Sequence, residues 1–191
     1  MPLLRMIDIV HTLLEHGIES RLGNIKSDVS SNYWPYFERW LGNRDGFIRL
    51  YNCNLDYVGS EDVMRIGPFY NIYCIIENHK LIDSDINHHR LIDSLPFYNL
   101  VNGKVLSFGW SGSILAERLS EDSQISYDFI SNIMNEETRS LSVRVIDFGV
   151  LIETRIWDKD GFFSIYGIVN KIAEHSKELL SQVHFGEEID I

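Results

Sequence analysis

The chain has 191 residues, of which 45% are hydrophobic, 12% aromatic and 24% charged, which excludes collagen, coiled-coil and disordered proteins. Its 17 Lys and Arg against 28 Asp and Glu give a formal net charge of −11. Because a protein that binds nucleic acid needs clustered cations and the sequence has no basic run, we expect no nucleic-acid partner.

Two helices and two strands are predicted in the first 77 residues. Apolar residues recur at helical spacing over residues 2–16, and Gly17 can end that helix. Residues 33–41 form a second, aromatic helix, whose Trp34 and Trp40 lie in the core or in a patch that binds a partner. Residues 47–51 and 69–77 are rich in β-branched and aromatic side chains, which favours strands.

A β-hairpin is the clearest local prediction. Asn102-Gly103 lies between apolar flanks and suits a two-residue turn, so residues 97–101 and 104–110 should pair. Residues 114–119 and 125–134 follow as helices, the second with Ser123 as its N-cap.

The last third of the chain begins with strands and ends with a helix. Residues 141–145 alternate apolar and polar side chains, which predicts a half-buried strand. We expect residues 150–157 and 162–166 to be strands joined by a turn at 158–161, and residues 168–183 to form a helix. The predicted class is therefore α+β: one domain, residues 1–191, with a mainly antiparallel sheet, helices on one face and a long C-terminal helix.

The cysteines and the apolar segments indicate a compartment. Cys53 and Cys74 are too few for a disulfide framework and show no zinc-binding spacing. Arg5 and Asp8 interrupt what would be the apolar core of a signal peptide. No apolar run approaches the roughly 18 residues of a membrane-spanning helix. We expect a cytoplasmic protein with no membrane partner.

A serine between glycines is the strongest catalytic candidate. Residues 109–113, Gly-Trp-Ser-Gly-Ser, follow a predicted strand and precede a predicted helix, as the nucleophile elbow of α/β-hydrolases does. Ser111 would be the nucleophile, with Asp147 and then His175 or His184 as its helpers. Ser113 stands where the elbow has its second glycine, and the neighbouring strands form hairpins, so a plain strand-to-helix turn is the favoured alternative.

The segment between residues 83 and 93 is the candidate metal site. If it is helical, Asp85, His89 and Asp93 share one face, with His88 and Asp83 close by. Arg90 would place a positive charge among these ligands, and the sequence lacks a known metal-binding signature. A solvated polar segment explains the pattern equally well, and we expect no cofactor.

Asp147-Phe148-Gly149 matches a tripeptide of protein kinases, but the other kinase motifs are missing. Strand alternation from residue 141 would direct Asp147 into the core. Either Gly149 marks a bulge that turns Asp147 outward, or a hydrogen-bond partner is buried with it.

The size and acidity of the whole chain resemble those of immunity proteins from bacterial polymorphic toxin systems, including contact-dependent growth inhibition. The resemblance implies a non-catalytic protein that binds a basic, nuclease-type toxin domain and blocks its active site. A small hydrolase that uses Ser111 or the metal candidate is the alternative function. The acidic residues expected to bind the partner, chosen for loop or helix-end positions, are Glu117, Glu121, Asp122, Glu136, Glu137, Asp158 and Asp160.

Overall fold

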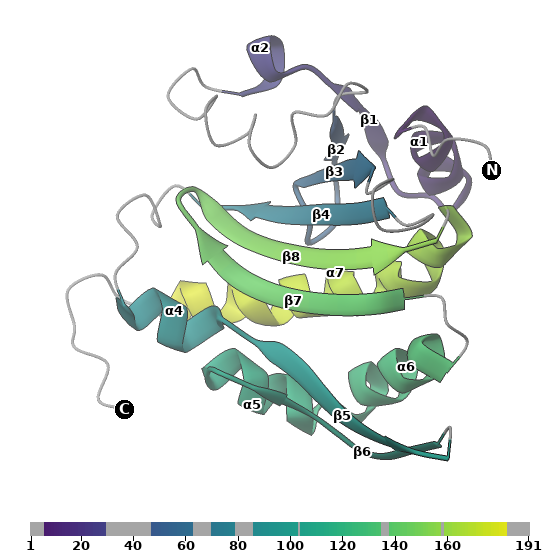
Figure 1. The fold of residues 1–191 in the computed structure, drawn as a ribbon. Helices are drawn as coiled ribbons and strands as arrows, with labels where there is room; N and C mark the ends of the chain where they lie inside the picture. Colours follow the sequence, from purple (N-terminus) through teal and green to yellow (C-terminus); the bar gives the residue numbers. More distant parts are fainter. Residues whose placement is uncertain are drawn as a thin grey trace.

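A six-stranded antiparallel sheet forms the centre of the fold, and a two-stranded hairpin lies below it in Figure 1. The structure is a computed structural model that describes residues 6–29, 47–62, 70–78, 86–102, 104–134, 138–157 and 159–182. The helices of these residues are α1 (Met6–Glu15), α2 (Ile25–Asp28), α4 (Ile86–Ile92), α5 (Ile114–Glu121), α6 (Ser123–Met134) and α7 (Lys159–Gln182). The strands are β1 (Ser20–Gly23), β2 (Phe47–Leu50), β3 (Tyr57–Asp62), β4 (Tyr70–Glu77), β5 (Leu95–Val101), β6 (Lys104–Ser111), β7 (Thr138–Ile146) and β8 (Gly149–Ile156).

The strand order of the large sheet is β1-β2-β3-β4-β8-β7, with every neighbouring pair antiparallel. Between β4 and β7 the chain leaves the sheet and forms α4, the β5–β6 hairpin, α5 and α6. It returns as the edge strand β7, and β8 then inserts between β7 and β4. The predicted α+β class with a mainly antiparallel sheet is confirmed.

Helices α1, α5, α6 and α7 share one large hydrophobic core with one face of the sheet. Helix α7 runs behind β7 and β8 in Figure 1. In α1 the buried residues are Met6, Ile9, Val10 and Leu13, which follow the helical spacing of an amphipathic helix. A second buried cluster on the opposite face of the strands includes Phe47, Tyr57, Tyr73, Leu151 and Phe148. The central strands are therefore apolar on both faces.

The β5–β6 hairpin is confirmed. Leu100 pairs with Val105 and Val101 with Lys104, on either side of the turn. Asn102 has a φ of 52°, the left-handed conformation that asparagine tolerates better than most residues. Gly103, the other predicted turn residue, lies outside the described residues.

The predicted turn at residues 158–161 and strand at 162–166 are wrong, because α7 already begins at Lys159. Phe162 and Ile165 are buried and continue the 3–4 spacing of Ile168 and Val169. Burial of this continuous apolar face favours one long helix and outweighs the preference of the Asp and Gly residues at its start for a turn. Asp160 in the first turn also stabilises the positive end of the helix dipole.

Asp147 does not point into the core. Ile146 pairs with Gly149, so Asp147 and Phe148 are the two residues of the β7–β8 turn. Asp147 is exposed, and Phe148 is buried in the second cluster. The alternation predicted from residue 141 holds through Val145 and ends with the strand.

Strands β1 and β3 were not predicted, because their short sequences contain Gly, Ser and charged residues that weaken the strand pattern. The aromatic helix predicted at residues 33–41, with Trp34 and Trp40, lies outside the described residues. Within the described residues, no helix has the length and apolarity needed to cross a membrane.

Candidate protein-binding surface

Two of the predicted partner-binding residues, Glu117 and Glu121, lie one turn apart on α5 and are both exposed. Helix α5 begins at a well-formed cap, because the backbone N–H of Ala116 donates to Ser113 Oγ at 3.2 Å. Its buried residues Leu115, Ala116 and Leu119 fix the rotation of the helix. Packing of that face leaves the two carboxylates in solvent.

Asp122, also predicted to bind a partner, is already engaged within the chain. Its Oδ1 accepts from the backbone N–H groups of Gln124 and Ile125 at 2.9 and 3.0 Å, so Asp122 caps α6. This corrects the prediction of Ser123 as the N-cap. His175 Nε2 lies 3.4 Å from Asp122 Oδ2, and Lys171 Nζ lies 3.9 Å from Oδ1.

The surroundings of Asp122 act on its pKa in opposite directions. Burial alone would raise it, but the backbone N–H of Ile125 and the side chain of His175 lower it. Lys171 and the backbone N–H of Gln124 add to this effect, and the net result is a pKa below the ordinary aspartate value. Asp122 therefore stabilises the α6–α7 packing as a carboxylate.

The other predicted acidic residues are spread along the chain. Asp160 is exposed in the first turn of α7. Glu136, Glu137 and Asp158 lie outside the described residues. Of the seven predicted residues, Glu117 and Glu121 are therefore the two that lie close together, are exposed and fall within the described residues.

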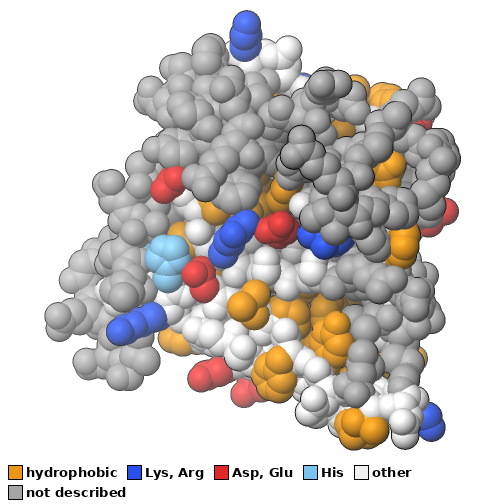
Figure 2. Space-filling model, in the orientation of Figure 1, with side chains coloured by type: hydrophobic (Ala, Val, Ile, Leu, Met, Phe, Trp, Pro, Cys, Tyr) orange, Lys and Arg blue, Asp and Glu red, His pale blue; other side chains and the backbone are white. Residues whose placement is uncertain are grey.

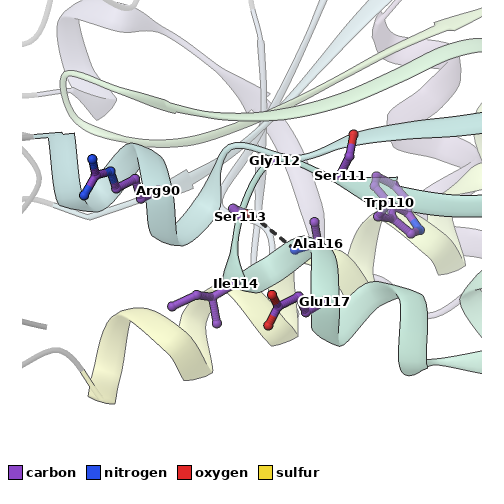
Figure 3. Close-up of a pocket in the computed structure, with 8 residues that line it drawn as sticks. All are labelled: Arg90, Trp110, Ser111, Gly112, Ser113, Ile114, Ala116 and Glu117. Atoms are coloured by element: carbon purple, nitrogen blue, oxygen red, sulfur yellow. Dashed lines mark hydrogen bonds between the residues drawn. The ribbon is translucent and has the colours of Figure 1, made fainter. Parts of the chain in front are cut away.

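An open pocket of about 500 Å³ lies beside α5 and is drawn in Figure 3. Arg90 of α4 and Glu117 of α5 bring opposite charges to its lining, and small polar residues of the β6–α5 turn complete much of it. In Figure 3 the side chains of Ser111 and Glu117 do not point toward each other. This mixture of charges does not single out an anionic or a cationic ligand.

The residues of the hydrolase hypothesis have separate partners. Ser111 is exposed, and its Oγ donates to the carbonyl of Leu95 at 3.4 Å. His175 lies against Asp122, and Asp147 lies in the β7–β8 turn. No hydrogen bond joins Ser111 to His175 or Asp147 in the described part of the chain, and His184 lies outside it. Residues 109–111 end β6, and Gly112 and Ser113 form the strand-to-helix turn of the alternative interpretation.

The metal candidate is helical from Ile86, as the hypothesis required. His89 Nδ1 lies 2.9 Å from Asp93 Oδ2, while Asp93 Oδ1 accepts from the backbone N–H of Val145 at 2.7 Å. Asp93 thus ties the end of α4 to β7. Among the residues that the structure describes, no group of three or more His, Cys, Asp or Glu could hold a metal ion. Asp83 and Asp85 lie outside those residues, and His88 is half-buried in α4.

Sequence reasoning missed a set of exposed apolar side chains on the β5–β6 hairpin, including Leu95, Phe97 and Leu106. A signal for them exists in the sequence. Lys104 is the one charged residue between Leu95 and Ser111, whereas 24% of the whole chain is charged. A hairpin with so little charge can hide only one of its two faces.

Comparison of this chain with protein-family models, curated proteins and solved structures finds no match.

Proposed function

We propose that this chain is a non-catalytic inhibitor that binds a basic toxin domain and blocks its active site, as immunity proteins do. The observation that supports this most is the pair of exposed carboxylates on α5, Glu117 and Glu121, in a chain of net charge −11. Among the described residues neither carboxylate forms an ion pair within the chain. Both remain available to the cations of a partner.

Complementary charge would raise both the association rate and the selectivity of such an inhibitor. A nuclease domain carries a basic surface to hold the phosphates of its substrate, and exposed carboxylates can occupy the same positions. Complementary charge accelerates the encounter of two proteins and disfavours wrong partners. Helix α5 suits this role, since Glu117 and Glu121 are exposed and its one cation, Arg118, lies 3.7 Å from Glu178 of α7.

The resemblance to immunity proteins supplies the biological setting of the proposal. Immunity proteins of this kind act in the bacterial cytoplasm, where an incoming toxin domain would otherwise reach its substrate. Their genes lie beside the gene of the toxin that they neutralise. We therefore propose a bacterial, cytoplasmic protein whose partner is encoded next to it.

The test is co-expression with the C-terminal domain encoded by the reading frame immediately upstream. We expect that domain to be basic, to stop growth when expressed alone, and to be neutralised by this chain. The double variant Glu117→Lys/Glu121→Lys should lose most of the protection, because it replaces two negative charges with two positive ones where cations of the partner would bind.

Glu15→Lys/Glu174→Lys is the matched control, since it produces the same net charge from exposed residues of α1 and α7. It should protect as well as the wild type. An upstream domain that is harmless, or one that kills equally with and without this chain, would refute the proposed function. Equal protection by both double variants would remove α5 from the interface.

A further inference from the structure

The β5–β6 hairpin exposes large apolar side chains. Leu95 is 58% exposed, Phe97 53%, Val101 48% and Leu106 68%. We call these four residues the apolar hairpin face. Figure 2 shows hydrophobic side chains gathered over β5 and β6, with acidic side chains beside them in the position of α5.

Strand alternation explains why the face is outside. Phe108 and Trp110 point inward, where their rings lie 5.2 and 5.9 Å from the ring of Phe129 in α6. Leu95 and Phe97 alternate with the inward residues and so point outward. The Phe97 ring lies over Gly109 on the neighbouring strand, because a Cβ added at Gly109 would come within 2.7 Å of Phe97 Cζ. The aromatic ring is thus held in place on the outer surface.

The most exposed residue of the apolar hairpin face, Leu106, lies at a β-bulge. Asn99 pairs with Ser107 and Leu100 with Val105, so Leu106 is an extra residue on β6. Bulges redirect side chains and often occur next to functional surfaces. Here the bulge coincides with a leucine in solvent, where burial of its side chain by a partner would contribute roughly 1.5–3 kcal/mol.

Contiguous exposed apolar side chains rimmed by polar residues are a mark of protein-interaction sites. The charge around the face discriminates between occupants. A second copy of this chain would bring another net charge of −11 against the acidic residues of α5, which disfavours a dimer through this face. A basic protein gains from both its apolar and its charged contacts.

The face and the acidic helix meet at the pocket. Ser111 pairs with Leu95 at the end of the hairpin, and Ser111 and Glu117 both line the pocket. We propose that the apolar hairpin face docks an apolar segment of the basic partner, while Lys or Arg residues flanking that segment contact Glu117 and Glu121. The positive charge of the partner is taken from the proposed function, whereas the location of the docking face is inferred from the exposed apolar residues of the hairpin.

A selection of short random displayed peptides against the intact chain tests the docking face without a known partner. We expect the selected peptides to combine apolar or aromatic residues with Lys or Arg. Phe97→Ser and Leu106→Ser should each weaken binding of these peptides by about tenfold or more. Glu117→Lys/Glu121→Lys should weaken it as well.

Leu14→Ser is the matched control, because Leu14 is 50% exposed on α1. Helix α1 packs against β1, at the opposite edge of the large sheet from β7, whereas the hairpin contacts β7. It should leave peptide binding unchanged. Phe97→Ser could weaken the hairpin itself, so thermal unfolding is measured for each variant, and Leu106→Ser carries the test if Phe97→Ser unfolds. Leu106 is too exposed for its loss to affect folding.

Three results would overturn the inference: no peptide binders, acidic peptides, or peptides that bind the Phe97 and Leu106 variants as tightly as the wild type. Light scattering that shows a dimer abolished by Leu106→Ser would also overturn it, in favour of a second copy. If peptides bind as expected but the upstream toxin domain is not neutralised, the proposed function fails and the docking face stands. The reverse pattern would keep the function and remove the face.

Discussion

Asp122 is the residue whose role changes most between the sequence and the structure. A carboxylate at the start of a helix is a candidate for binding a basic partner, and the sequence shows nothing against that role. In the folded chain its two oxygens are used by the N–H groups of α6 and by His175 and Lys171 of α7. The long-range partners are more than forty residues away in sequence, so the sequence alone could not predict them.

Asp122→Ala should lower the free energy of unfolding by about 1–2 kcal/mol, because it removes the cap of α6 and the contact with His175. Urea unfolding followed by circular dichroism measures the change. Ser123→Ala is the control and should stay within about 0.5 kcal/mol of the wild type. Equal losses in the two variants would mean that Asp122 is not the cap.

The pH dependence of the free energy of unfolding should also reveal the stabilising role of the Asp122 carboxylate. The folded-state pKa of Asp122 is depressed, so its stabilisation is complete above the unfolded-state pKa of about 3.9 and is lost as the pH falls through the folded-state value. Asp122→Asn keeps a capping oxygen that cannot titrate. We expect the stability difference between wild type and Asp122→Asn to shrink as the pH falls below about 4. A difference that stays constant from neutral pH to acid would contradict this.

At the scale of elements, patterns of period two and of period three to four predicted most of the fold. The strand at β7, the β5–β6 hairpin, and helices α1, α5 and α6 each combine a clear period with a turn or capping residue. The errors at residues 158–166 and at Asp147 occur where local turn residues and periodicity favour different structures. The structure follows the helical period in the first case and the turn in the second. The exposed face of the hairpin was missed because strand alternation does not say which face finds a partner.

Gly149 illustrates a packing constraint that no local pattern reveals. It pairs with Glu77 of β4 and with Ile146 of β7, and an added Cβ would collide with the backbone carbonyl of Ile76. Gly149→Ala should therefore destabilise the protein by about 1–3 kcal/mol, because the two central strands would have to separate.

Gly167→Ala provides the opposite case, since Gly167 is exposed within α7 and an added Cβ meets no atom within 4 Å. This variant should gain up to about 1 kcal/mol from the better helix propensity of alanine. Both changes are measured by urea unfolding. A neutral Gly149→Ala would show that the close approach of β4 and β8 can relax at little cost.

At the scale of the whole molecule, a net charge of −11 accompanies a group of exposed apolar side chains on one hairpin, Leu95, Phe97, Val101 and Leu106. These two properties complement each other in a binding protein. In the proposed complex, long-range charge would bring a basic partner to the surface, and apolar contacts would then slow its dissociation. Ser111, His175 and Asp147 have separate partners, so in the described part of the chain they form no assembled triad.

The salt dependence of binding tests this account most directly. The chain is titrated with an inactive form of the basic domain encoded upstream, at about 50 mM and about 500 mM NaCl. The account predicts an association rate that falls at least about tenfold over this range, a smaller change in the dissociation rate, and a reduced salt effect for Glu117→Lys/Glu121→Lys. Tight binding with an association rate that does not respond to salt, or no binding at either concentration, would contradict it.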